Sequence, residues 1–402
     1  MNDERSATDG TERPAPAIGL GERFAPGEHG RVERVLDDLE ALGVEHLRVP
    51  IPSTGARAGA DEAWYAWLLP RLAEDVTVLP CFTRPAPPHA GRSERAREAV
   101  DYAAFVGRTL DRFGDCFSWV ELAIASSSRD GAGRLDRGGE GVAALAEAVE
   151  AVRVRGKRVV LGGVRPPDVQ RLERMGREGL LDAADAVGVR VMPGRESGAR
   201  VAREEDLRAV RDVLARRGAD AAVWITEAGY ATRQYDEYRQ LQAFAEAAAA
   251  PAERLYWSAV HDRARADASW EGERRAHLGL RRSNGRPKLL LRVWAEQGLD
   301  GVRRLARLGE RDGNERRRIG TAPALAPKNG RRPVLITGGA GFIGANLAHR
   351  LLEGGEPVLI FDNLSRPGVE RNLQWLIDEH GPLLSWRIDD VRNAQALREA
   401  VA

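Results

Sequence analysis

A glycine-rich segment near residue 340 carries residue types that bind phosphate through the protein backbone. Glycines stand at positions 338, 341 and 344, between the apolar run Val334–Thr337 and the amphipathic stretch Ala345–Glu353. Gly338 permits a tight turn after a strand, and Gly341 lets a pyrophosphate approach the backbone. Gly344 lets the following helix pack closely, and the N-terminus of that helix faces the phosphate charge. This spacing predicts a dinucleotide-binding loop.

An acidic residue follows the next apolar run, Pro357–Phe361. It is Asp362, close to the spacing of about 20 residues at which a carboxylate binds the ribose hydroxyls of an adenosine. A carboxylate repels a 2′-phosphate, so the cofactor NAD is favoured over NADP. A third run, Leu384–Ile388, ends in Asp389 and Asp390, which suit the lining of an adenine pocket. The alternative is a glycine-rich turn in an unrelated α/β unit.

These segments resemble a known family. The motifs are Thr337-Gly-Gly-Ala-Gly-Phe-Ile-Gly344, Asp362-Asn-Leu364 and Asp390-Val-Arg392, and they are similar to those of the extended short-chain dehydrogenase/reductases that epimerise or dehydrate nucleotide sugars. The run from Phe361 to Trp375 looks most like the CDP-paratose 2-epimerase branch. The resemblance covers about the last seventy residues and implies a Rossmann domain with NAD as cofactor. It assigns cofactor contacts to Gly338, Gly341, Phe342, Ile343, Gly344, Asp362, Asn363, Asp390 and Val391.

The catalytic pair of that family is missing from the chain. Its members use a Tyr-x-x-x-Lys pair, in which the lysine lowers the pKa of the tyrosine that acts as base. The only lysines here are Lys157, Lys288 and Lys328, and none has a tyrosine four residues earlier. The resemblance therefore implies a truncated module, which binds the cofactor without completing the family's reaction. We expect half a Rossmann sheet to leave an open edge and one uncovered face, which weakens cofactor binding.

The larger part of the chain must be a separate domain. Between residues 17 and 302, short apolar runs alternate with amphipathic helical stretches, which predicts a (β/α)₈ TIM barrel. The expected strands are Ile18–Leu20, His46–Ile51, Val76–Phe82, Ser118–Ile124, Val159–Val164, Ala186–Val191, Ala222–Thr226 and Leu255–Val260. The expected helices include Gly30–Leu42, Glu94–Phe113, Gly141–Arg155, Glu204–Arg217 and Asp236–Ala250.

One strand of this barrel also resembles a known family. The run from Ala222 to Tyr230 is similar to the nucleophile strand of retaining glycoside hydrolases of the large barrel clan, including β-xylosidase-like and cellulase-like families. The resemblance implies that Glu227 occupies the nucleophile position, at the strand end where barrel enzymes keep their catalytic groups. It also implies that Arg48 supports this carboxylate. The closing stretch from His277 to Lys288 looks like the end of such barrels.

The same resemblance predicts a degenerate site. Retaining hydrolysis needs two carboxyl groups about 5–5.5 Å apart. Ile124 and Ala125 stand where the family has Asn and the acid/base Glu, and Arg190 replaces a histidine. Glu121 faces the same side as Ala125 but lies roughly 13 Å deeper, at about 3.3 Å per residue.

The barrel is therefore expected to be a pseudoenzyme that binds sugar without hydrolysing it. An ion pair between Arg190 and Glu227 would favour an anionic or phosphorylated ligand. A relocated acid, Glu196 or Asp130, is the alternative that keeps an active glycosidase.

Other candidate residues are weaker. The serines at 126–128 lack a His and an Asp in an order that suggests a triad. Trp64, Tyr65 and Trp67 have the spacing of a stacking platform for sugar, although the core or rim of a barrel suits them better. The seven histidines and the two cysteines, Cys81 and Cys116, show no metal-ligand spacing, so we expect no metal site.

Bulk properties limit the remaining possibilities. The net charge is +1 over 402 residues, which argues against a nucleic-acid partner. No run of eighteen apolar residues occurs, so no membrane span is expected. Residues 1–16 have the composition of a disordered tail rather than of a secretory signal, and two cysteines fit a cytoplasmic protein. Residues 303–332 are basic and then rich in Pro and Ala, which predicts a linker before the partial Rossmann unit at 333–402.

Three functions follow from these observations. The first is an NAD-binding epimerase- or dehydratase-type module of nucleotide-sugar metabolism, fused to a barrel that binds a sugar or nucleotide sugar. The second is a non-catalytic carbohydrate-binding or scaffold barrel that carries a remnant Rossmann unit. The third is an active retaining glycosidase with a relocated acid/base.

Overall fold

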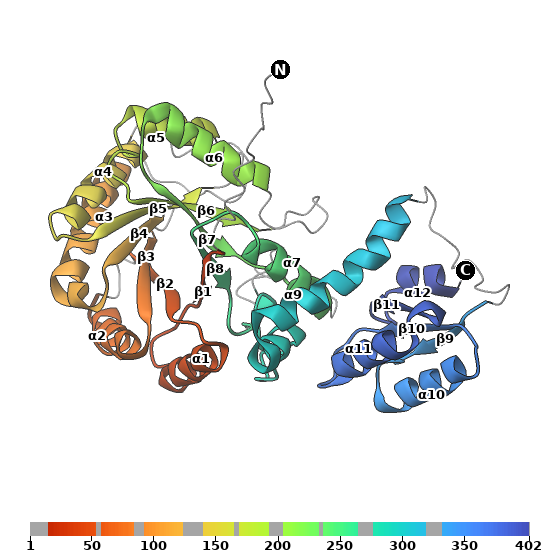
Figure 1. The fold of residues 1–402 in the computed structure, drawn as a ribbon. Coiled ribbons are helices and arrows are strands. Elements are labelled where there is room, and N and C mark those ends of the chain that lie inside the picture. Colours follow the sequence, from red (N-terminus) through yellow and green to blue (C-terminus); the bar gives the residue numbers. More distant parts are fainter. Residues whose placement is uncertain are drawn as a thin grey trace, which may run out of the picture.

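The N-terminal domain is the predicted barrel. The computed structural model of the chain describes residues 15–53, 58–83, 92–123, 140–164, 169–192, 204–232, 236–263, 276–318 and 332–401. Eight parallel strands pair in sequence order, and the last pairs with the first to close the barrel (Figure 1). The strands are β1 (Ala17–Gly21), β2 (His46–Pro52), β3 (Thr77–Thr83), β4 (Trp119–Ala123), β5 (Arg158–Val164), β6 (Ala186–Val191), β7 (Ala222–Ala228) and β8 (Arg254–Ser258).

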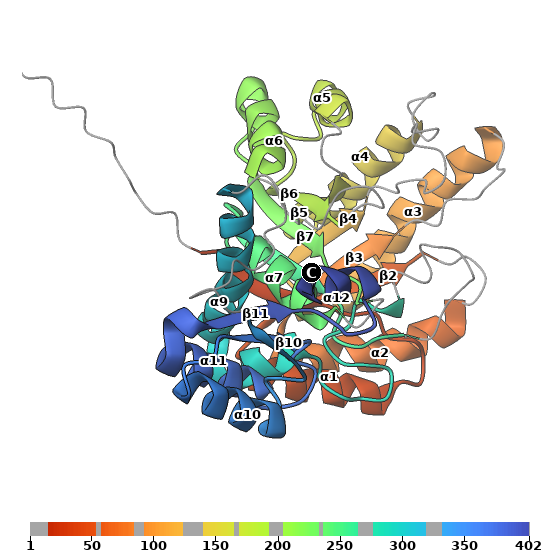
Figure 2. The ribbon, with the colours of Figure 1, turned by 90° about the vertical axis from the view of Figure 1, so that its right-hand side faces the viewer.

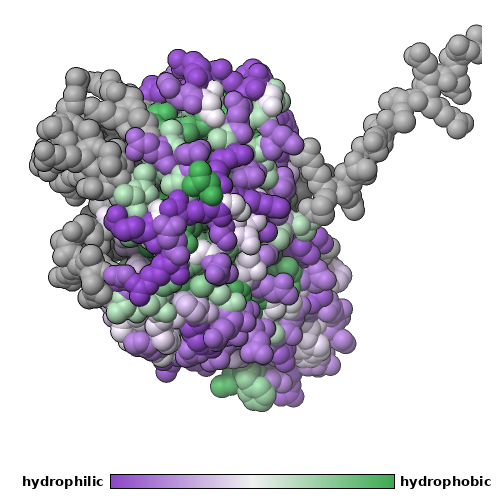
Figure 3. Space-filling view, turned by 90° about the vertical axis from the view of Figure 1, so that its left-hand side faces the viewer, coloured by the Kyte–Doolittle hydropathy of each residue, from purple (hydrophilic) through white to green (hydrophobic). Residues whose placement is uncertain are grey.

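Helices surround these strands. They are α1 (His29–Leu42), α2 (Ala58–Asp75), α3 (Arg92–Phe113), α4 (Glu140–Arg153), α5 (Val169–Arg177), α6 (Glu204–Arg217) and α7 (Glu237–Ala248), with a short 3₁₀ turn η1 (Gly114–Cys116). In α1 the apolar residues Val32, Val35 and Leu39 recur at helical spacing, and all three are buried. The outer side of the helix layer is mostly hydrophilic (Figure 3). The predicted alternation of strand and helix is confirmed, with boundaries shifted by a few residues.

Aromatic side chains close the N-terminal end of the barrel interior. Trp119 and Trp224 lie with ring centroids 4.5 Å apart, within a buried cluster that includes Tyr256. The guanidinium of Arg254 lies 4.3 Å from the ring centroid of Trp224, and that of Arg158 lies 5.1 Å from the ring of Trp119. The interior is therefore filled by side chains at this end.

The segment after the barrel differs from its prediction. Helix α9 (Leu289–Arg318) continues well past residue 302, so residues 303–318 of the predicted linker 303–332 are helical, and residues 319–331 lie outside the described part of the chain. Its arginines alternate with Val302, Leu305 and Leu308, which are buried at helical spacing. The Tyr238 hydroxyl of α7 donates to the carbonyl oxygens of Leu305 and Ala306 at 3.0 and 3.1 Å. Packing against α7 therefore retains a helix where composition indicated a linker.

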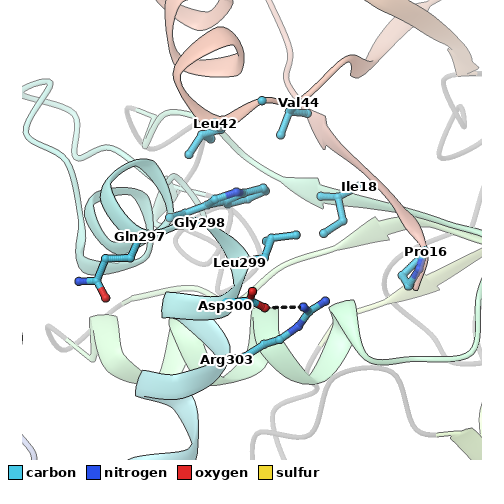
Figure 4. A pocket seen from close by; sticks show the side chains of 11 residues that line it. Pro16, Ile18, Leu42, Val44, Gln297, Gly298, Leu299, Asp300 and Arg303 are labelled. Carbon is cyan, nitrogen blue, oxygen red and sulfur yellow. Dashed lines mark hydrogen bonds and ion pairs between the residues drawn. The ribbon is translucent and has the colours of Figure 1, made fainter. Parts of the chain in front are cut away.

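A break divides α9 into two helices. Gly298 has φ 66° and ψ −170°, a conformation that side-chain-bearing residues rarely adopt. The break borders a cavity of about 490 Å³ at the N-terminal end of the barrel, between β1, the end of α1 and α9 (Figure 4). Trp294, Leu42 and Ile18 give it apolar walls, and Asp300 and Arg303 pair across its rim at 3.0 Å. Pro16, which the sequence predicts to end a disordered tail, is buried in the wall of this cavity.

The C-terminal unit is a small parallel sheet in the order β11-β10-β9. Its elements are β9 (Val334–Thr337), α10 (Phe342–Glu353), β10 (Val358–Asp362), α11 (Val369–His380), the 3₁₀ turn η3 (Gly381–Leu383), β11 (Leu384–Ile388) and α12 (Ala394–Val401). Helices α10 and α11 lie on one side of the sheet and α12 on the other, in both views (Figures 1 and 2). The strand order, with one α-helix in the connection between each pair of successive strands, matches the first half of a Rossmann domain. Within the described part of the chain β9 pairs with β10 alone, so one edge is open as expected.

The C-terminal unit lies beside α9, the helix that follows the barrel (Figures 1 and 2). Among the described residues, none of the helices combines the length and the apolar character that a membrane crossing requires.

Candidate functional site

The fold brings the predicted site residues together in two groups, one in the C-terminal unit and one in the barrel. The first is the turn between β9 and α10. Gly338 has φ +65°, in the left-handed region that favours glycine. A Cβ on Gly344 would lie 2.4 Å from the Gly338 carbonyl oxygen, and one on Gly341 would lie 3.1 Å from the same atom. The backbone therefore favours glycine at 338 and excludes a Cβ at 344, while a Cβ at 341 would make a tight contact.

The start of α10 is open on the side of this turn. Gly341 is the N-cap residue and no side chain caps the helix, so side chains leave its first N–H groups accessible. Phe342 and Ile343 are more than 80% exposed, at 83% and 81%. A glycine-rich backbone turn next to an uncapped helix N-terminus fits the pyrophosphate of a dinucleotide.

Asp362 lies against the same turn. One of its carboxylate oxygens accepts a hydrogen bond from the Ala340 N–H at 3.1 Å, and the other accepts one from the Leu364 N–H at 2.8 Å. The carboxylate at the end of β10 is thus tied to the glycine turn at the end of β9. Parallel pairing of β10 with β9, which aligns Phe361 with Thr337, brings the two strand ends together.

The end of β11 adds a third part. The Asn363 amide donates to Asp390 at 2.7 Å, so the ends of β10 and β11 are also linked. Arg392 holds the same carboxylate with two side-chain hydrogen bonds of 2.6 and 2.7 Å. The hydrogen bonds from Arg392 keep the pKa of Asp390 well below its usual range. Val391 is half exposed beside them.

The second group lies at the C-terminal mouth of the barrel. Arg190 on β6 and Glu227 on β7 form an ion pair, with 3.2 Å between the arginine Nε and a carboxylate oxygen. The strand register shifts between Val189 and Arg190, so that Thr226 has no partner on β6 and Glu227 pairs with Arg190. This bulge explains why both Thr226 and Glu227 turn toward the barrel interior, although they are neighbours in sequence.

Arg48 occupies a deeper layer than Glu227. It donates to the two carboxylate oxygens of Glu121 at 2.5 and 3.1 Å, and to the Cys81 sulfur at 3.0 Å. Glu121 is completely buried, as its depth on the strand predicts. A Cβ on Gly162 would collide with the Glu121 carboxylate at 1.9 Å, so glycine makes the room for it. Glu121 is therefore bonded to Arg48 in a layer below the mouth.

Cys81 shares the environment of this ion pair. Burial raises the pKa of its thiol well above the ordinary value, and the Arg48 cation opposes the shift. The nearby carboxylates of Glu121 and Glu227 raise the pKa of this thiol further. The thiol stays neutral at physiological pH and acts as a hydrogen-bonding partner rather than as a nucleophile.

Several predicted positions lie outside the described residues. These are Ile124, Ala125, the serines at 126–128, Asp130 and Glu196. Of the aromatic residues proposed for stacking, Trp64 is 5% exposed and packs on Trp67 and His29. Trp64 therefore belongs to the hydrophobic core.

The prediction missed Glu22, which directly follows β1 and is fully enclosed. Its carboxylate accepts hydrogen bonds from the N–H groups of Val260 and His261 at 3.0 and 2.9 Å and from Arg31 at 2.9 Å. A charged residue immediately after a barrel strand is the signal that marks such a position. Because Glu22 braces β1 against the segment after β8, it does not supply a free acid at the mouth.

Comparisons with known proteins find similarity for both parts of the chain, beginning with the C-terminal unit. Residues 335–402 match the family model of GDP-mannose 4,6 dehydratase. CDP-paratose 2-epimerase of Salmonella typhi is 56% identical over 43 residues, which are 11% of this chain and 13% of that protein. The chain thus spans a small part of the length of that relative.

The structure also aligns with solved structures of glycoside hydrolases at low sequence identity. A family 39 glycoside hydrolase from Bacteroides cellulosilyticus WH2 aligns with a TM-score of 0.48 and 13% identity, over 70% of this chain and 63% of that one. The exo-beta-1,4-mannosidase Op5Man5 from Opitutaceae bacterium strain TAV5 aligns with a TM-score of 0.49 and 14% identity, over 89% and 80% of the two chains. The assignment of a closed parallel barrel rests on the strand pairing itself.

Proposed function

We propose that the C-terminal unit binds NAD. The pyrophosphate lies against the turn from Gly338 to Gly344 and the N-terminus of α10, and the adenosine ribose lies at Asp362. Asn363, Asp390 and Val391 border the adenine. The observation that carries this proposal is the hydrogen bond from the Ala340 N–H to Asp362, because it holds a ribose-binding carboxylate beside the phosphate cradle.

Calorimetric titration with NAD and with NADP tests this proposal. We expect saturable binding of NAD and weaker binding of NADP, because the Asp362 carboxylate repels a 2′-phosphate. Asp362→Asn should weaken NAD binding by about tenfold and reduce the preference for NAD over NADP. Asp378→Asn is the matched control, since Asp378 is exposed on α11 and pairs with Gln374. If the wild-type chain shows no saturable uptake of NAD, the proposal fails.

We further propose that this unit is a cofactor-binding module of nucleotide-sugar metabolism that does not itself complete the reaction. The matches to a GDP-mannose 4,6 dehydratase model and to a CDP-paratose 2-epimerase support the class of substrate. The sequence contains no Tyr-x-x-x-Lys pair to act as base. The chain's own residues therefore hold and orient a cofactor, and we expect no conversion of nucleotide sugars by this chain alone.

The barrel is proposed to bind a sugar at its mouth without hydrolysing it. The ion pair between Arg190 and Glu227 carries this proposal. A nucleophile held by a cation needs a second carboxyl group nearby for retaining hydrolysis. Among the described residues, Glu121 and Glu22 are buried and bonded to other groups. The guanidinium of Arg190 at the mouth favours an anionic ligand, such as a phosphorylated sugar.

Two measurements separate binding from hydrolysis. Activated aryl glycosides need little acid assistance, and we expect no turnover of them. Turnover that Glu227→Gln abolishes would instead establish the chain as an active retaining glycosidase. For binding, glucose 1-phosphate and glucose are the probes, and we expect Arg190→Met to remove the preference for the phosphorylated sugar. Equal affinity of the wild type for both sugars would contradict the role of Arg190.

A further inference from the structure

The barrel and the C-terminal unit meet through a buried arginine. Arg292 lies in the first turn of α9 and is 6% exposed. Its Nη2 donates to the carbonyl oxygen of Leu364 at 2.8 Å and reaches that of Arg366 at 3.4 Å, and its Nη1 reaches that of Ser365 at 3.5 Å. The guanidinium of the barrel helix thus meets three consecutive carbonyl groups of the loop after β10.

The backbone of this loop is shaped for the contact. Leu364 has φ +53°, an uncommon conformation for a residue with a side chain, and it is completely buried. On the barrel side, Glu237 lies 3.9 Å from Arg292 and also accepts a hydrogen bond from the Leu289 N–H at 2.7 Å. A buried cation needs compensation of its charge and its hydrogen bonds, and here the two domains supply it together.

The same loop carries the carboxylate of the proposed dinucleotide site. The N–H of Leu364 donates to Asp362, and the other oxygen of Asp362 binds the Ala340 N–H of the glycine turn. A chain of short contacts therefore runs from Arg292, through the peptide units of the loop, to Asp362 and the phosphate cradle. A second contact supports the arrangement, because the Trp386 indole on β11 donates to the Leu308 carbonyl of α9 at 3.4 Å.

We propose that helix α9 of the barrel is a platform that completes the dinucleotide site, and that Arg292 is the positioning residue which holds Asp362 in place. The barrel then has a second role besides any sugar binding at its mouth, because it orders the ribose-binding loop of a unit whose own sheet is small. This inference rests on the proposed binding of NAD, and its structural part is testable without the cofactor.

The test compares Arg292→Met with Arg292→Lys and with Arg304→Met in the full chain. Arg304 is an exposed arginine of the same helix that bonds to Gln297, so it controls for a lost charge on α9. Hydrogen exchange reports on the loop directly. We expect the amide of Leu364 to exchange at least about tenfold faster in Arg292→Met than in the wild type. In Arg304→Met its exchange rate should equal that of the wild type. Arg292→Lys should give an intermediate rate, since an ammonium reaches fewer of the three carbonyls.

Cofactor binding gives the second readout. In Arg292→Met we expect the affinity for NAD to fall about tenfold and the preference over NADP to shrink, because Asp362 is no longer held beside the cradle. If Arg292 only stabilised the fold, Arg292→Met would lower the affinities for NAD and for NADP by the same factor. The preference for NAD over NADP would then be unchanged.

The outcomes also separate the two proposals. Unchanged exchange of Leu364 in Arg292→Met overturns the inference, whether or not NAD binds. Faster exchange in a protein that never binds NAD supports the platform and refutes the dinucleotide site. If Arg292→Met does not fold, Arg292→Lys carries both measurements.

Discussion

Charged side chains inside the barrel are paired with groups of opposite charge, and small neighbouring residues leave space for them. Arg48 and Glu121 bond to one another with almost no exposed surface, and the glycine at 162 leaves the space that the carboxylate occupies. A buried ion pair contributes little net stability by itself, but a single buried charge without its partner is costly. The pair therefore acts as a unit beneath the mouth residues Arg190 and Glu227.

Removing one member of this unit should be more harmful than removing both. We expect Glu121→Gln to lower the free energy of unfolding by about 3 kcal/mol, since it leaves the Arg48 charge buried and uncompensated. The double variant Arg48→Met/Glu121→Leu should cost less than about 1 kcal/mol, because it replaces the pair by apolar groups of similar volume. Urea denaturation at neutral pH measures both. A double variant as unstable as the single one would argue against this account.

His261, which follows Val260 at the barrel mouth, should make the free energy of unfolding depend on pH. Burial, followed by the positive charge of Arg31, lowers the pKa of His261 to about 4 from an ordinary value of 6.5. Between these values the unfolded chain binds a proton that the folded chain does not. The contribution of His261 is therefore complete above pH 6.5 and is lost as the pH falls toward 4.

We expect this loss to reach about 2 kcal/mol at pH 5. Urea denaturation from pH 7 to pH 5 measures it, with His261→Gln as the comparison. The stability of the variant should fall less steeply than that of the wild type. Parallel curves for the two proteins would show that the pKa of His261 is not lowered.

At the scale of the element, the turn between β9 and α10 depends on its glycines. Its three glycines serve different purposes, since Gly338 needs a left-handed backbone while Gly344 needs the absence of a Cβ. Helix α10 then starts directly at the turn, with its N-terminus uncapped. In the proposed dinucleotide site, the turn and the start of this helix would contact the pyrophosphate through backbone groups.

Gly344→Ala tests this element. The added Cβ would lie 2.4 Å from the Gly338 carbonyl oxygen and 2.6 Å from the Gly339 Cα, both backbone atoms that cannot move without the turn. We expect a loss of about 1–3 kcal/mol in stability and at least about tenfold in affinity for NAD. Gly30→Ala is the control, because its Cβ meets nothing closer than Arg34 at 3.6 Å in a helix. It should be neutral or slightly stabilising. Thermal unfolding and calorimetry measure the two effects, and an unchanged affinity would count against the cradle.

At the scale of the whole molecule, α9 belongs to both domains. It packs on α7 through Leu305 and Ala306, and it contacts the C-terminal unit through Arg292 and Leu308. The ion pair of Glu296 with Arg371 also crosses this boundary, but both side chains are well exposed. The buried and the exposed contacts should therefore differ greatly in their contribution to the association of the two domains.

We expect Arg292→Met to lower the stability of the C-terminal unit by about 2–3 kcal/mol, because three carbonyl groups lose a charged donor. Arg371→Met should cost less than about 1 kcal/mol, since solvent and salt screen an exposed pair. Denaturant-dependent hydrogen exchange of amides in β10 and β11 measures the stability of this unit separately from the barrel. Equal effects of the two variants would mean that the interface is held by its rim rather than by Arg292.

Local patterns in the sequence were sufficient for the elements and for the dinucleotide signature. Apolar periodicity places eight strands and most helices, and the glycine spacing with Asp362 defines a cradle, because both depend on residues near one another along the chain. The depth of Glu121 and its separation from the mouth also follow from strand spacing alone.

Only the tertiary structure decided how distant residues are partnered. Composition indicated a linker at residues 303–332, and residues 303–318 of this segment are helical, with Leu305 and its neighbours packed against α7. The pairing of Arg48 with Glu121, the bulge that turns Glu227 toward Arg190, and the reach of Arg292 to the loop after β10 all join residues far apart in sequence. Their burial and charge depend on which strands and helices lie side by side, and no local pattern specifies that arrangement.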